Sequence, residues 1–207
     1  MALAYVNGNN SSGTGTSLTY SVDCTSADIL LVGIAVSSGT VSTVTYNGVS
    51  MTLDVSNTTN TKTYIYRLNN PTTSTNDVVI TPSGSTTVYS CAVAYSGASS
   101  TGQPDATNSY TEALTDTVGV SVTTIDSDCV VVAFGINIGA TTITRTSSGN
   151  TRQSSSQRIM FDSGTVASPS SFFSEFTSNY ASGAATICVA SIKPSITTTN
   201  SGFFALI

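Results

Sequence analysis

The residue types that most enzymes use for chemistry are scarce in this chain of 207 residues. It contains no histidine, which excludes Ser-His-Asp and Cys-His catalysis and histidine metal sites. A general base would have to be a carboxylate, and the candidate pairs are Asp126 with Asp128 and Glu112 with Asp116. Both pairs fall in or beside predicted loops, where acidic side chains mostly serve solvation or turns. We therefore predict no catalytic residue and no enzymatic activity.

Metal and cofactor sites lack a sequence signature as well. Asp and Asn oxygens in loops are suitable ligands for Ca²⁺, but the chain has no DxDxDG-like run. Widely spaced cysteines without a CxxC pair favour buried free thiols over disulfides, zinc or redox sites. These cysteines are Cys24, Cys91, Cys129 and Cys188. The sequence predicts no cofactor and no metal.

Charge and hydropathy restrict the partners. With 6 basic and 11 acidic residues the formal net charge is −5, so nucleic acid binding is not expected. No apolar run approaches the roughly 20 residues that span a bilayer, so membrane insertion is not expected either. The initial Met1 and the lack of a leader-like segment favour synthesis and assembly in a host cytoplasm, as for virion proteins. A removed leader, and with it an extracellular surface location, is the alternative.

The periodic segments are rich in valine, isoleucine, threonine and tyrosine, which is typical of strands. The apolar run 29–36 predicts a central strand covered on both faces. Residues 41–55 alternate around Asn47-Gly48, which predicts a type I′ hairpin. The segment 169–180 is ambiguous, with aromatic residues at near-helical spacing, and we favour a strand. Further strands are expected at 63–68, 76–81, 86–95, 118–125, 129–138, 141–146, 157–162 and 184–192.

The order of these strands occurs twice. Residues 23–36 resemble 126–138, and residues 86–97 resemble 184–194. Short strands separated by turn signals are typical of a sandwich or jelly roll. We predict an all-β fold: a single β-sandwich over residues 17–195, jelly-roll-like, with a weak internal two-fold repeat and a polar connection at 96–117.

The two ends of the chain look unlike the sandwich. Residues 1–16 combine a short apolar stretch with a flexible polar linker, and residues 196–207 combine a polar spacer with an apolar tip. Leaving such a tip in water forgoes roughly 1.5–3 kcal/mol of burial for each large side chain. Either this tip adds an edge strand to its own domain or it docks on a neighbouring subunit. The candidate assembly contacts are Leu3, Tyr5, Phe203, Phe204, Leu206 and Ile207.

Four strings carry a resemblance to a known domain: VTYNGVSMT at 44–52, YIYRLNNPTTSTNDVVITPSG at 64–84, AVAYSGA at 92–98 and CVASIKP at 188–194. They resemble an uncharacterised β-sandwich domain of phage structural proteins and of bacterial surface or secreted proteins. The resemblance covers about residues 17–194 and implies a fold, with no catalytic residue to transfer.

Three functions are compatible with these observations. The first is a non-enzymatic structural protein of a virion surface, as capsid decoration or a tail or fibre component. It would contact other virion proteins or further copies of itself, most simply as a dimer or trimer. The second is a carbohydrate-binding module that uses exposed tyrosines, although core packing is the favoured role for most of them. Its candidate residues are Tyr46, Tyr64, Tyr66, Tyr89 and Tyr110. The third is a self-assembling extracellular filament subunit.

Overall fold

The computed structural model describes residues 1–195, and strands make up most of this part of the chain. Within it, no helix is long and apolar enough to cross a membrane. The strands of the first part are β1 Ala4–Gly15, β2 Leu18–Asp23, β3 Ile29–Val36, β4 Val41–Tyr46, β5 Val49–Ser50, β6 Thr52–Asn57, β7 Lys62–Asn69, β8 Thr75–Pro82 and β9 Thr86–Ser96. Those of the second part are β10 Ala106–Glu112, β11 Thr117–Thr123, β12 Cys129–Asn137, β13 Ile143–Arg145, β14 Asn150–Ser154, β15 Arg158–Val166, β16 Ser171–Ser178 and β17 Ala185–Ile192.

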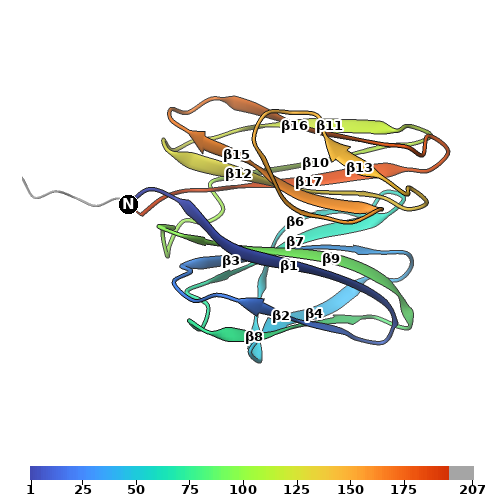
Figure 1. Ribbon diagram of the computed structural model, residues 1–207, viewed down its shortest axis with the longest axis horizontal. Coiled ribbons are helices and arrows are strands. Elements are labelled where there is room, and N and C mark those ends of the chain that lie inside the picture. Colours follow the sequence, from blue (N-terminus) through green and yellow to red (C-terminus); the bar gives the residue numbers. More distant parts are fainter. Residues whose placement is uncertain (196–207) are drawn as a thin grey trace, which may run out of the picture.

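These strands form four sheets that are stacked as layers (Figure 1). The first half, residues 1–98, contributes outer sheet 1 (β2-β8-β4-β5) and inner sheet 1 (β1-β9-β3-β7-β6). The second half, residues 106–195, contributes inner sheet 2 (β10-β17-β12-β15-β14) and outer sheet 2 (β11-β16-β13). A short linker, residues 99–105, connects the halves. The two inner sheets lie next to each other in the middle of the molecule.

Each half has the strand pairing of a jelly roll, which is a long antiparallel hairpin folded over on itself. In the first half β1 pairs with β9, β2 with β8, β3 with β7 and β4 with β5. In the second half β10 pairs with β17, β11 with β16 and β12 with β15. The all-β, sandwich-like prediction is thus confirmed. The structure adds that the repeat forms two sandwiches, one for each half, packed against each other.

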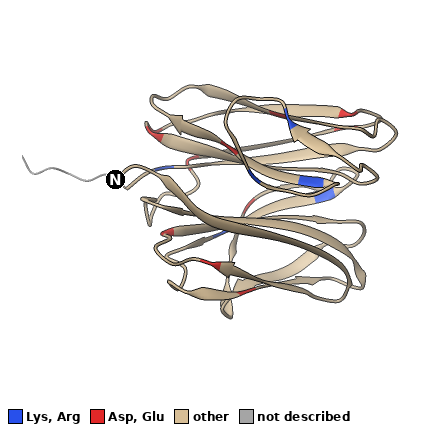
Figure 2. Ribbon diagram, in the orientation of Figure 1, with Lys and Arg blue, Asp and Glu red and all other residues tan. Residues whose placement is uncertain are grey.

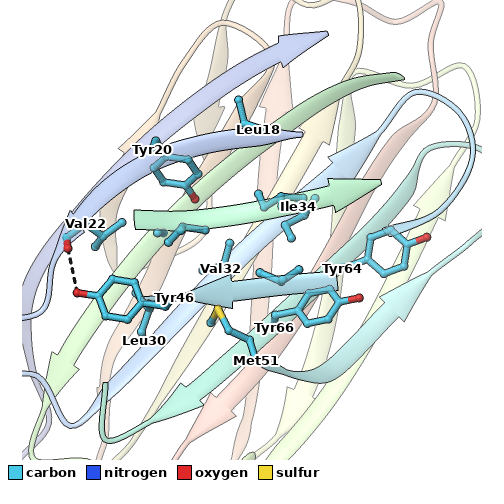
Figure 3. Close-up of a cluster of buried hydrophobic side chains, with 14 of the residues drawn as sticks. Leu18, Tyr20, Val22, Leu30, Val32, Ile34, Tyr46, Met51, Tyr64 and Tyr66 are labelled. Atoms are coloured by element: carbon cyan, nitrogen blue, oxygen red, sulfur yellow. Dashed lines mark hydrogen bonds between the residues drawn. The ribbon is translucent and has the colours of Figure 1, made fainter. Parts of the chain in front are cut away.

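Three buried apolar clusters separate the four layers. Outer core 1 lies between the sheets of the first half, and Figure 3 shows its tyrosines among the other buried side chains of this cluster. The central core lies between the two inner sheets, and outer core 2 lies between the sheets of the second half. Because β3 and β12 contribute side chains to two cores each, every residue in both strands is buried. This confirms the central position predicted for 29–36.

Two local predictions are confirmed, the type I′ turn at Asn47-Gly48 and a strand within 169–180. Asn47 and Gly48 have φ angles of 50° and 76°, as a type I′ turn requires, and the flanking residues Tyr46 and Val49 are paired. The ambiguous segment 169–180 contains strand β16, which is the counterpart of β8.

The prediction of a flexible N-terminal arm over residues 1–16 is wrong. Strand β1 is the edge of inner sheet 1 and pairs with β9 from Ala4 opposite Ser96 to Gly15 opposite Thr86. The segment 96–117 is also more than a connection, because it contains β10, the equivalent edge of inner sheet 2. Both strands are polar because an edge strand leaves many of its side chains in water while its backbone still completes the sheet.

Candidate functional site

The predicted assembly contacts near the N-terminus lie against the chain's own core. Leu3 is 8% exposed and belongs to the central core. The Tyr5 ring packs edge-on against Tyr95, with ring centroids 5.9 Å apart. The guanidinium of Arg152 lies 4.4 Å from the centre of the same Tyr5 ring. Leu3 and Tyr5 therefore hold the two halves together and offer little surface to another subunit.

The predicted contacts Phe203, Phe204, Leu206 and Ile207 lie outside the described residues. The structure does show where the chain enters that segment. The amino group of Met1 donates to the carbonyl oxygen of Ser195 at 2.7 Å, and the Ser195 amide donates to the Gly97 carbonyl at 2.8 Å. Residue 195 thus lies beside the N-terminus, at the end of the molecule where the two halves meet (Figure 1).

A groove at this end is lined by residues of both halves, including Met1, Asp28, Asp126, Asp128 and Lys193. Two of its acids already have partners: Asp28 accepts from a backbone amide at 2.5 Å, and Asp126 lies 3.2 Å from the Lys193 ammonium. Within residues 1–195 no cluster of acidic or cysteine side chains is arranged to hold a metal ion. The groove is a polar surface feature next to the start of the segment 196–207.

The second carboxylate pair lies on the second half. Glu112 is exposed and accepts a hydrogen bond from the Tyr110 hydroxyl. Asp116 is also exposed and accepts from the Thr117 hydroxyl at 3.1 Å. Both acids form local surface hydrogen bonds of the kind expected from solvating loop residues.

Most of the tyrosines that could bind carbohydrate belong to the buried cores or pack against them. Tyr46, Tyr64 and Tyr66 are buried in outer core 1, as core packing predicts, and Tyr89 packs against the central core. The exception is Tyr110, which is 45% exposed. Sequence patterning did not single out a second exposed aromatic residue, Phe173 on outer sheet 2. Its ring covers Gly119, where an added Cβ would come within 2.4 Å of it.

All four cysteines are free and buried, as predicted. Burial raises the pKa of both the Cys91 and the Cys188 thiol to about 12. Such thiols remain protonated at neutral pH, and the thiolate is the reactive form. These cysteines therefore act as small apolar side chains.

A buried polar cluster joins the two halves, and sequence reasoning missed it. Asp162, on the second half, accepts from Tyr95 of the first half at 2.7 Å and from the Arg152 guanidinium at 2.5 Å. Burial raises the pKa of Asp162, but hydrogen bonds from Arg152 and Tyr95 outweigh it, and the pKa is lower than usual. Arg158, also on the second half, donates to the Ser90 carbonyl at 3.1 Å.

A second ion pair ties the first half to the linker. The Arg67 guanidinium lies 3.0 Å from Asp54 and also donates to the Gln103 carbonyl at 2.9 Å. Burial raises the pKa of Asp54, and Arg67 offsets this only partly. Charged residues are otherwise few and far apart on the ribbon (Figure 2). The described charges are therefore most closely organised where the two halves meet.

Comparison with protein-family models, curated proteins and solved structures found no significant match. The class of the protein follows from its own strands: it is an all-β protein with two jelly-roll sandwiches in one chain. The resemblance to a phage structural domain stays a prediction.

Proposed function

We propose that this chain is a non-enzymatic structural protein of a virion surface, which works through contacts with other copies of itself or with other virion proteins. The observation that carries the proposal is the position of residue 195, which lies beside the N-terminus at one end of a sandwich pair. From there, twelve residues with the apolar tip FFALI continue the chain. Covering an apolar tip of this composition with another surface lowers the free energy, because its side chains leave water.

The arrangement suits a contact role for a physical reason. Layers held by three cores are already assembled, so a contact made by a short segment at one end leaves these layers unchanged and avoids the cost of reordering them. Addition of a strand to an exposed sheet edge is a common way to make such a contact. The same logic applies to a capsid decoration and to a tail or fibre component.

The experiment compares the full chain with a variant in which Phe203, Phe204, Leu206 and Ile207 are changed to serine. Light scattering after size exclusion should show an oligomer for the full chain and a folded monomer for the variant. A matched control changes Thr197, Thr198 and Thr199 to serine and should leave the oligomer intact. A monomeric full chain would contradict the contacts between copies, and an oligomer that survives loss of the tip would contradict the role of the tip.

Carbohydrate binding is the second candidate. The observation in its favour is the exposed ring of Phe173, which lies over Gly119 on outer sheet 2 beside the exposed Ser121. A flat aromatic ring among hydroxyl groups is the kind of surface that sugars stack on.

A further inference from the structure

The two inner sheets contact each other reciprocally. Strand β1 lies against β14, and its counterpart β10 lies against β6. In the same way β9 contacts β15 and β17 contacts β7, while β3 contacts its own counterpart β12 in the middle. Reciprocal contact is the property of an isologous interface, which relates two protomers by a two-fold axis. The halves of this single chain are thus arranged like the two subunits of a dimer.

The residues at the centre of this arrangement differ between the halves. Gly33 on β3 is paired with Cys91 on β9. Phe134 on β12 is paired with Cys188, the equivalent position on β17. Gly33 and Phe134 are therefore counterparts, and they face each other. A Cβ on Gly33 would come within 2.3 Å of the Phe134 ring, so the ring occupies the space that glycine leaves.

The two buried ion pairs are also counterparts, with their charges reversed. On β7, Arg67 lies two residues after the residue that pairs with Gly33. On β15, Asp162 lies two residues after the residue that pairs with Phe134. Asp54 occupies the bulge of β6 and Arg152 the bulge of β14, each next to its ion-pair partner. The first half carries the acid on its edge strand, and the second half carries the base there.

These differences make a half unsuited to a copy of itself. Two second halves would bring two Phe134 rings to one position, and two first halves would leave a void between two copies of Gly33. In a pair of first halves, Arg67 would also take the place of Asp162. The Tyr95 hydroxyl would then lose the carboxylate to which it now donates and meet a guanidinium, which has no acceptor.

We propose that the inner face of each half is a pairing surface that accepts a half of the opposite type and rejects its own copy. Gly33 and Phe134, together with the two reversed ion pairs, determine this specificity. The partner is the opposite half, from the same chain or from a second copy. Specificity of this kind needs features that penalise the wrong pair as well as features that favour the right one. The inference is independent of the segment 196–207, so its failure would not affect the proposed function.

The experiment uses the full chain with a protease site inserted in the exposed linker, between Thr101 and Gly102. The folded protein is cleaved, mixed with an isotope-labelled cleaved sample and examined by native mass spectrometry. The expected species are pairs of one first half and one second half, with labelled and unlabelled halves exchanged. Homodimers of either half at comparable abundance would overturn the proposal, and so would dissociation into single halves.

Two variants of the uncleaved and cleaved chain test the central residues. Gly33→Phe places two phenylalanines at one position, and we expect it to weaken the pairing of the cleaved halves roughly 10-fold to 100-fold. Gly33→Phe with Phe134→Gly exchanges the large and the small residue and should recover most of the loss. Where the halves of a cleaved variant dissociate, the melting temperature of the uncleaved chain is measured instead. It should be highest for the wild type, intermediate for the double variant and lowest for Gly33→Phe. A double variant that pairs as weakly as Gly33→Phe alone, or more weakly, would overturn the role of this contact.

Discussion

The outer cores of the two halves are built differently on the same strand pairing. Outer core 1 contains Ile34 and Ile80, and outer core 2 has Gly135 and Phe176 at the equivalent positions. A Cβ on Gly135 would come within 2.4 Å of the Phe176 ring, so one large and one absent side chain replace two of intermediate size. The comparison shows that the space between the two sheets of this jelly roll must be filled. Two facing positions can fill it with two side chains of intermediate size or with one large and one absent side chain.

The halves also differ in how much core they have. Outer core 1 includes four tyrosines and Met51, and its outer sheet has four strands. Outer sheet 2 has three strands, because β5 has no counterpart, and β13 has only three residues. A sheet with a shorter edge strand and a smaller core has fewer contacts to hold it. The first half therefore has the larger core of the two.

The largest effect is expected from the pair Gly135 and Phe176. Phe176→Ala should lower the free energy of unfolding by about 3–5 kcal/mol, because it leaves a cavity in outer core 2. Adding Gly135→Ala should recover part of this loss, since its methyl group enters the vacated space, whereas Gly135→Ala alone should destabilise. Urea unfolding measures all three variants. Additive losses in the double variant would show that the two positions do not share one volume.

The reversed ion pairs should respond to pH in opposite ways. The pKa of Asp162 is lowered in the folded state, so its contribution to stability is present above the unfolded-state pKa and is lost as the pH falls through the folded pKa. The pKa of Asp54 is raised, so its contribution is present at low pH and is lost as the pH rises through the raised pKa.

Two substitutions measure this contrast. Asp162→Asn should cost roughly 3 kcal/mol at pH 7, because it leaves Arg152 without its partner, and it should reduce the loss of stability on acidification. Asp54→Asn should make the acid sensitivity steeper. The measurement is the difference in urea midpoint between pH 7 and pH 3 for each variant and the wild type. The same pH response in both variants would contradict the assignment of opposite shifts.

A smaller effect is expected from the tyrosines, which outer core 1 contains and outer core 2 lacks. The Tyr46 hydroxyl donates to the Ser74 carbonyl at 2.6 Å and to the Val22 carbonyl at 3.1 Å, and Figure 3 shows the bond to Val22. Burial raises the pKa of Tyr46 to about 12. Tyr46→Phe should cost about 1–2 kcal/mol because both acceptors lose their donor. The control Tyr110→Phe, at an exposed position, should stay within about 0.5 kcal/mol. Thermal unfolding of the two variants compares them directly, and equal losses would argue against a structural role for the Tyr46 hydroxyl.

Sequence patterning found the strands whose burial is strong, and the strands that it missed all lie at sheet edges. The apolar run 29–36, the Asn47-Gly48 turn and the repeated order of central strands were all visible. Strands β1, β10 and β14 were missed, because an edge strand packs little of its surface and its composition looks like that of a loop. The edge strand β2 was missed as well. For the same reason the linker prediction for residues 1–16 failed.

The amino-acid sequence by itself determined the all-β class, the duplication and the free cysteines, because these depend on local alternation, turn residues and composition. Only the tertiary structure decided that the repeats stack face to face, that Phe134 fills the space at Gly33, and that the two buried ion pairs are reversed copies. The contact between Gly33 and Phe134 joins residues about a hundred positions apart on separate layers, and each ion pair joins an edge strand to its neighbour within one sheet. A pattern along one strand carries no information about which layer will cover it.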